Sequence, residues 1–130
     1  ANRFIGLGDW LRGGIPTTIN SDHMIGMDPD HSMNSFNPFL LMSIAVSRQN
    51  DQGLILGEHQ KISRQEALRC YTSTAAYLGF DEKRKGSLEA GKLADLVVID
   101  RDFTSCPTDQ IHKIRVLKTM VNGKFVYQRD

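Results

Sequence analysis

The sequence changes its periodicity near residue 86, and this change restricts the possible fold more than any other feature. Before it, apolar residues recur at helical spacing in short segments, whereas residues 96–99 and 116–127 are rich in β-branched and aromatic side chains. Asn122-Gly123 interrupts the last stretch, and Asn-Gly between β-rich runs is the strongest short-range signal for a type I′ hairpin. We therefore expect an α+β chain, with a domain boundary between residues 1–85 and 86–130.

Two helices are expected in the first half of the helical portion. Residues 4–12 carry apolar side chains at helical spacing, and Gly13-Gly14 is typical of a C-cap. Residues 38–49 begin at Pro38, which suits a first helical turn. That second helix should bury one apolar face, with its residues at i, i+3, i+4 and i+7 spacing, namely Leu41, Ile44, Ala45 and Arg48. Arg48 is interpreted as structural, since a cation suits a helix C-terminus.

A third helix is predicted over residues 63–79. Ser63 and Glu66 have the spacing of a capping box, in which each side chain satisfies a backbone N–H of the other residue. Gly79 is expected to end the helix in the left-handed conformation. Small side chains, including Ala75 and Ala76, should allow a close approach by a neighbouring segment.

Between the first two helices the sequence predicts a strand followed by a long loop. Residues 15–19 are mostly β-branched and end in Asn20-Ser21-Asp22-His23. Residues 24–37 have no hydrophobic period, and a loop of this length indicates a functional role. Asp22 on its own is most simply interpreted as a turn cap, because Asp side chains often bond to nearby backbone N–H groups.

The β-rich ending begins with a bend punctuated by glycines, Gly86 and Gly91. Asp95 is expected to close a turn before the strand over residues 96–99, and the apolar character of that strand predicts burial on both faces. Cys70 and Cys106 lie in unlike contexts and are predicted to be reduced thiols.

Composition excludes several classes of function. Sixteen Lys and Arg against fifteen Asp and Glu leave a net charge of +1, with no basic stripe, so neither nucleic acid nor a membrane surface is expected as a partner. The chain has no apolar run long enough to span a membrane and no signal-peptide pattern at its start, so a cytoplasmic location is expected.

Three passages together cover nearly the whole chain: Trp10–Pro16 leading into Asn20–His23, Phe36–Phe39 leading into the helices at 45–48 and 66–76, and Lys85–Asp100. They resemble the amidohydrolase superfamily, in particular its amidohydrolase-3-type branch of exoenzyme-regulatory-like hydrolases. The resemblance implies a C-terminal fragment of a larger protein with a (β/α)8 TIM-like barrel and an adjoining β-sandwich domain. Residues 1–85 would hold the last βα portion of the barrel, and residues 86–130 the C-terminal strands of a composite sandwich.

The resemblance also implies a site that holds one or two divalent metal ions, usually zinc, at the C-terminal ends of the barrel strands. Asp22 stands in the place of the aspartate after the last strand, where it would ligate metal and act as the catalytic base for a metal-bound water. The substrate would be a small amide or cyclic amide, cleaved at a carbon–nitrogen bond that is not a peptide bond. His23 is the candidate substrate-binding residue.

The remaining candidates have simpler interpretations. His31, His59 and His112 lie in contexts unlike the metal-ligand positions of the superfamily. Residues 28–34 are rich in Asp and Asn but lack the Gly and terminal Glu of an EF-hand calcium loop. Met24, Met27 and Met33 either line a pliable apolar pocket or fill gaps in packing.

Two hypotheses remain open from the sequence. In the first, the chain is part of an amidohydrolase and is inactive alone, with no tightly bound metal, because one ligand cannot hold catalytic zinc. In the second, it is a non-catalytic domain that self-associates, as a homodimer, through strand edges and apolar faces that lack partners.

Overall fold

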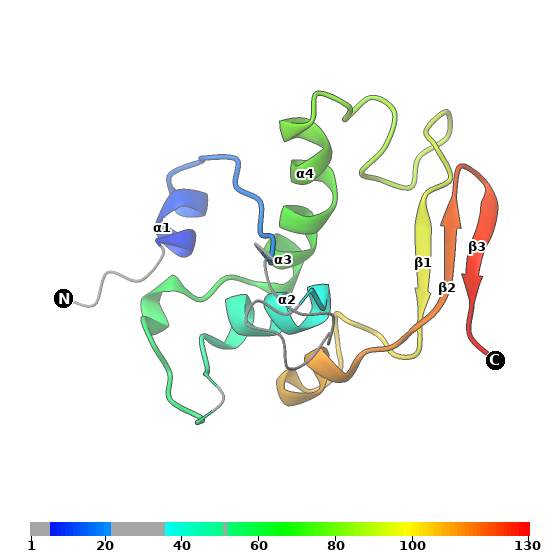
Figure 1. The fold of residues 1–130 in the computed structure, drawn as a ribbon. Helices are drawn as coiled ribbons and strands as arrows, with labels where there is room; N and C mark the ends of the chain where they lie inside the picture. Colours follow the sequence, from blue (N-terminus) through cyan, green and yellow to red (C-terminus); the bar gives the residue numbers. More distant parts are fainter. Residues whose placement is uncertain (1–5, 22–35, 51) are drawn as a thin grey trace.

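A computed structural model of the chain describes residues 6–21, 36–50 and 52–130. In chain order the elements are α1 (Leu7–Arg12), α2 (Pro38–Ser47), the 3-10 helix η1 (Glu58–Gln60), α3 (Arg64–Tyr71), α4 (Ser73–Leu78), β1 (Leu96–Ile99), the 3-10 helix η2 (Thr108–Lys113), β2 (Val116–Val121) and β3 (Lys124–Gln128). The helices lie on one side of the molecule and the three-stranded sheet on the other (Figure 1). The predicted α+β architecture is therefore confirmed.

The hydrophobic core lies among the helices and not on the sheet. η2 packs against α2, and α2 packs against α3, so a helix from beyond residue 86 shares the core of the helical portion. Ile111 of η2 has no exposed surface. The buried members of this core are Leu7, Phe39, Met42, Ala45, Ile62, Ala67, Cys70, Phe103, Ile111 and Ile114.

The apolar face predicted for α2 is wrong in part. Ala45 is buried, but Ile44 is 40% exposed, and the other buried apolar side chains are Phe39 and Met42. The reason is tertiary: η2 and α3 both pack on α2, and together they select the face that is covered. Arg48 ends the helix at φ 56° and its Nε donates to the carbonyl of Leu56 at 3.1 Å, which agrees with a structural role.

The capping box is confirmed, but the helix that it starts is broken. The Ser63 hydroxyl accepts from the Glu66 N–H at 3.2 Å, and Glu66 accepts from the Ser63 N–H at 2.7 Å. The chain leaves helical geometry at Thr72 (φ −123°, ψ −93°), where the hydroxyl donates to the carbonyl of Leu68 at 2.7 Å. The single helix predicted over residues 63–79 is therefore two helices, α3 and α4.

The end of α4 also differs from the prediction. Gly79 has φ −85°, and the left-handed residue is Phe80 at φ 56°. The Gly79 N–H still closes the helix by donating to the carbonyls of Ala75 and Ala76, both at 3.1 Å. The reversal is thus displaced by one residue, onto Phe80, whose side chain is almost fully exposed.

The close approach predicted from the small side chains is made by Gly86. This residue has φ +91°, and a Cβ atom built on it would lie 2.6 Å from the Cβ of Ala76 and 3.1 Å from the Cα of Ser73. Only glycine fits this position without displacing α4. The contact fixes the point at which the chain leaves the helices for the sheet.

The sheet has the order β1-β2-β3 with antiparallel pairs throughout. Asn122 (φ 48°) and Gly123 (φ 76°) both take positive φ, which confirms the type I′ hairpin. Asp95 has the structural role expected of it: its carboxylate accepts from the Asn122 N–H at 2.7 Å and ties the hairpin turn to the start of β1.

Burial of the strand 96–99 on both faces is wrong. Val97 is 52% exposed and Val98 is 41% exposed, because no described element packs over these side chains. The strand predicted over residues 15–19 is not formed either, since no segment in the described ranges offers it a ladder. Ile19 nevertheless packs against the core. In the part of the chain that the structure describes, no helix is long and apolar enough to cross a membrane.

Candidate active site

The two residues predicted to carry the chemistry, Asp22 and His23, lie outside the described residues, as do His31 and the loop methionines. The structure describes the chain up to Ser21 and again from Phe36. Ile19, three residues before Asp22, packs against the hydrophobic core. The chain segment that leads to Asp22 is therefore held against the core by an apolar contact.

The return from the candidate site is anchored by Asn37. Its side-chain Oδ1 accepts from the N–H groups of Phe39 (3.0 Å) and Leu40 (3.4 Å) and so caps α2. Its Nδ2 donates to the carbonyl of His112 in η2 at 3.3 Å. One amide side chain thus fixes the start of α2 and joins it to η2. This role of Asn37 was not predicted from the sequence, although an Asn before Pro38 is a recognisable N-cap.

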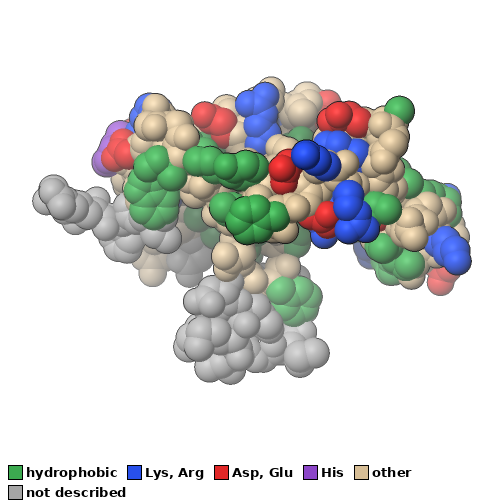
Figure 2. All heavy atoms as spheres, turned by 90° about the horizontal axis from the view of Figure 1, so that it is seen from above, with side chains coloured by type: hydrophobic (Ala, Val, Ile, Leu, Met, Phe, Trp, Pro, Cys, Tyr) green, Lys and Arg blue, Asp and Glu red, His purple; other side chains and the backbone are tan. Residues whose placement is uncertain are grey.

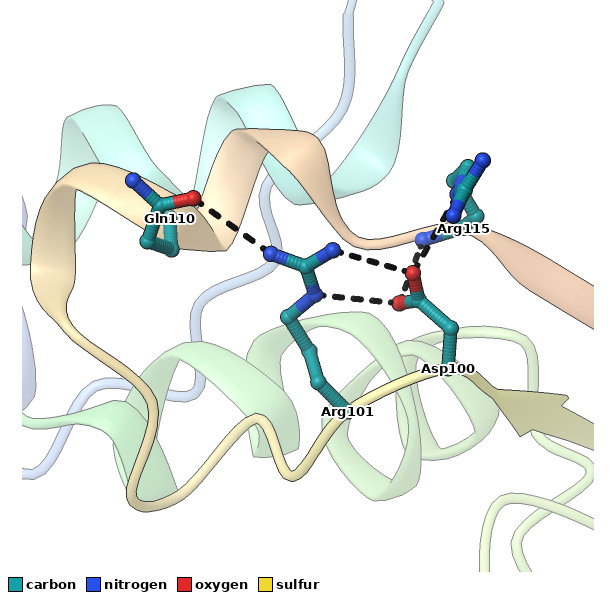
Figure 3. Close-up of polar contacts among 4 residues, drawn as sticks. All are labelled: Asp100, Arg101, Gln110 and Arg115. Atoms are coloured by element: carbon teal, nitrogen blue, oxygen red, sulfur yellow. Dashed lines mark hydrogen bonds and ion pairs between the residues drawn. The ribbon is translucent and has the colours of Figure 1, made fainter.

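A network of charged side chains joins the end of β1 to the start of β2 (Figure 3). Asp100 accepts from Arg101 Nε (3.2 Å) and Nη2 (3.0 Å), and also from the backbone N–H (3.0 Å) and Nε (3.2 Å) of Arg115. Arg101 Nη1 reaches Gln110 Oε1 of η2 at 3.4 Å. The hydrogen bonds from Arg101, followed by those from Arg115, hold the pKa of Asp100 well below its usual range. Asp100 is therefore ionised and satisfied, which is a structural role.

Arg64 makes the corresponding connection from the helical side. Its Nη1 donates to the carbonyl of Phe103 at 2.6 Å and lies 3.6 Å from Cys106 Sγ, and its Nη2 donates to Thr108 Oγ1 at 3.2 Å. The first residue of α3 thus holds the segment between β1 and η2. The helical pattern gave no sign of this contact, because the partners lie about forty positions away in sequence.

The remaining nucleophilic and metal-binding side chains do not converge in the described ranges. No group of three or more His, Cys, Asp or Glu side chains there could hold a metal ion. His59 and His112 contribute backbone carbonyls to Arg12 and Asn37. Cys70 and Cys106 are free thiols, as predicted, and burial raises the pKa of Cys70. Burial also raises the pKa of Tyr71 to about 12.

Comparison with known proteins agrees with this architecture. The sequence model described as the amidohydrolase family matches residues 8–127. The chain is 35% identical over 115 residues to the N-substituted formamide deformylase of Arthrobacter pascens, which covers 88% of this chain and 21% of that protein. It is 27% identical over 117 residues to YtcJ of Bacillus subtilis (strain 168), an amidohydrolase by name, covering 88% of this chain and 22% of that protein.

A solved structure shows the same fold. The crystal structure of an amidohydrolase from Thermotoga maritima MSB8 superimposes with a TM-score of 0.66 at 22% identity, over 95% of this chain and 26% of that one. The chain thus spans about a fifth of the length of the curated relatives that it matches. Because the family match extends over almost every residue, the chain belongs to the amidohydrolase family.

Proposed function

We propose that this chain is the C-terminal part of a metal-dependent hydrolase that cleaves carbon–nitrogen bonds, other than peptide bonds, in small amide-type molecules. The observation that carries the proposal is the 35% identity to a named deformylase over 115 residues. In this proposal Asp22 is a metal ligand and the base of the reaction, and His23 contacts substrate. The location remains cytoplasmic in the proposal, with no nucleic-acid or membrane partner.

The described residues do not form a metal site by themselves. A catalytic zinc site needs about three protein ligands, and Asp22 would supply one of them. The other ligands must therefore come from residues outside the described ranges. What the described residues contribute is support: Ile19 and Asn37 anchor the two ends of the segment that holds Asp22.

The barrel and the composite sandwich belong to the same proposal. Residues 15–19 would become the last barrel strand once neighbouring strands give their backbone groups partners. The three-stranded sheet would be covered by further strands of the whole protein. The support for both is that the chain matches only 21–26% of the length of the proteins it resembles, while it exposes apolar side chains on its sheet.

Hydrolysis by the full-length protein tests the proposal. N-substituted formamides are the substrates to try first, because the deformylase is named for them. We expect release of formate and amine, loss of activity after removal of metal with a chelator, and recovery when zinc is added back. A short peptide of similar size should not be cleaved. Activity that persists in the thoroughly chelated enzyme, or the absence of hydrolysis across small amides and cyclic amides, would contradict the proposal.

The 130-residue chain alone is expected to be inactive and to hold no stoichiometric zinc, since it offers one candidate ligand of the superfamily set. Elemental analysis of the purified chain measures this directly. Tightly bound zinc that is lost on Asp22→Asn substitution would show that the chain carries a complete site.

A non-catalytic, self-associating domain is the second candidate, and a specific observation favours it. The sheet and α4 expose large apolar side chains, among them Val126, Tyr127 and Tyr77, and Figure 2 shows hydrophobic side chains at the surface on the face seen from above. A groove of about 400 Å³ between α1 and α4 is lined by Leu11, Gly14, Ile15, Pro16, Ser73, Thr74 and Tyr77. Sedimentation of the full-length protein separates the candidates: a homodimer without hydrolytic activity supports the second one, and an active monomer eliminates it.

A further inference from the structure

A cavity of about 410 Å³ lies where α2 meets η2, and its lining is positively charged. The lining residues are Asn37, Leu40, His112, Lys113, Ile114 and Arg115. Lys113 and Arg115 each bring a full positive charge, and no acidic residue is among the described residues that line the cavity. A concave surface with two positively charged side chains is more suited to bind an anion than a single lysine on a convex surface.

The positive charges that line the cavity are only partly neutralised within the described part of the chain, because Arg115 is paired with Asp100 while Lys113 has no acidic partner there. No acceptor there engages Lys113 Nζ or the His112 imidazole, and Arg115 uses only its backbone N–H and its Nε, both on Asp100. Asp100 is shared with Arg101, so one carboxylate faces two guanidinium groups. The Nη1 and Nη2 atoms of Arg115 therefore remain available as donors.

The wall of the cavity is held in place by backbone and side-chain hydrogen bonds. The carbonyl of His112 accepts from Asn37 Nδ2, and the carbonyl of Ile111 accepts from the Ile114 N–H at 3.1 Å. Asn37 Oδ1 already accepts from the N–H groups of Phe39 and Leu40, so the first turn of α2 offers the cavity its partial positive charge and not these two donors.

We propose that this cavity binds a small oxyanion, a carboxylate or a phosphate group, through Lys113 Nζ and the Nη atoms of Arg115. Charge-assisted hydrogen bonds from Lys and Arg to such oxygens are the strongest type available to an exposed protein surface. Ile114 and Leu40 give the cavity an apolar floor that suits a small organic acid as well as an inorganic ion. The proposed site is independent of Asp22 and of the hydrolase activity.

Calorimetric titration of the full-length protein tests the site, with inorganic phosphate and succinate as separate probes at constant ionic strength set with sodium chloride. Saturable binding of at least one probe is expected. Lys113→Gln should weaken it about tenfold or more, the range for loss of one charge-assisted hydrogen bond, and Lys113→Arg should retain it. Lys83→Gln, which removes an equally exposed lysine after α4, is the matched control and should leave the affinity unchanged.

The two probes separate the sources of the oxyanion: tighter succinate binding identifies a carboxylate ligand, and tighter phosphate binding identifies a phosphate. The proposal is overturned if neither probe binds saturably above the sodium chloride background. It is equally overturned if Lys113→Gln and Lys83→Gln weaken binding to the same extent, since that result indicates general charge screening.

Discussion

The helical portion and the sheet are stabilised in different ways. The helices and η2 share a core in which ten apolar side chains are buried, whereas no side chain of β1, β2 or β3 reaches that degree of burial in the described structure. Burial of apolar surface contributes roughly 25 cal/mol per Å², so the helical portion holds most of the hydrophobic stabilisation. The sheet depends on its backbone ladder, its type I′ turn and the polar contacts of Asp95 and Asp100.

Both faces of the sheet carry large apolar side chains. Thr119 pairs with Val97 and with Tyr127, so these side chains share one face of the sheet. Met120 pairs with Leu96 and with Phe125, which places them on the other face. An antiparallel sheet exposed to water on one side normally alternates apolar and polar side chains. A sheet without that alternation is suited to be an inner layer, which agrees with a chain that spans a fraction of the length of its relatives.

Truncation of a core side chain should have the largest effect on stability and should separate the two regions. Ile111→Ala removes a fully buried side chain at the contact between η2 and α2, and the expected loss is about 2–5 kcal/mol in the free energy of unfolding. Val126→Ala in β3 is the matched change at an exposed site and should cost about 0.5 kcal/mol or less. Chemical denaturation of both variants measures the two losses. Equal losses would contradict the conclusion that the helical portion holds most of the hydrophobic stabilisation.

Substitution of glycines at the connection between the regions should have an effect of similar size at Gly86 and a smaller one at Gly91. Gly86 and Gly91 both have φ close to +90°, so alanine at either position costs about 1–2 kcal/mol in backbone strain. Only at Gly86 does the new Cβ atom meet Ala76, and this overlap should add roughly 1–3 kcal/mol. Denaturation of Gly86→Ala and Gly91→Ala measures the difference between them. If the two variants lose the same stability, the Gly86 contact with α4 does not join the regions.

Low pH should reduce the stability of the fold through Asp100, which joins β1 to β2. Its pKa is lowered in the folded state, so its contribution to stability is full above the ordinary value of 3.8 and is lost as the pH falls towards the folded value. Below about pH 4 the unfolded chain binds a proton that the folded chain does not accept. Thermal unfolding between pH 5 and pH 2, a range chosen to bracket roughly the carboxyl pKa values, should show a weaker pH dependence for Asp100→Asn. An unchanged pH dependence would show that Asp100 does not contribute to the loss of stability at low pH.

Local sequence signals predicted the parts of this fold that local chemistry determines. The capping box at Ser63 and the hairpin at Asn122-Gly123 form as predicted, because each depends on residues within a few positions of one another. The buried face of α2, the break at Thr72 and the exposure of Val97 were not predicted. The first and the third depend on which segment packs there, and periodicity contains no information about that partner. At Thr72 the hydroxyl bonds to the carbonyl of Leu68 where the helix breaks, and the helical pattern does not register that contact.

At the candidate site, too, some residues could be predicted from the sequence and others could not. The resemblance to the amidohydrolases singled out Asp22 and His23, and the family is confirmed, while both residues lie outside the described ranges and their roles stay predictions. The side chains that support the site were not predicted. Asn37 and Arg64 make contacts with residues about forty to seventy-five positions away, and no spacing rule connects such positions.

The central claim is that the segment that holds Asp22 carries the chemistry and the rest of the chain supports it. The kcat/KM of the full-length enzyme for an N-substituted formamide, compared between wild type and Asp22→Asn, tests this most directly. We expect a loss of about 10²–10⁴-fold for Asp22→Asn, the range for removal of a general base. Asp109→Asn, at an exposed carboxylate of η2 that accepts a hydrogen bond from Gln110 Nε2, should leave kcat/KM unchanged. An Asp22→Asn enzyme with wild-type kcat/KM would contradict the claim.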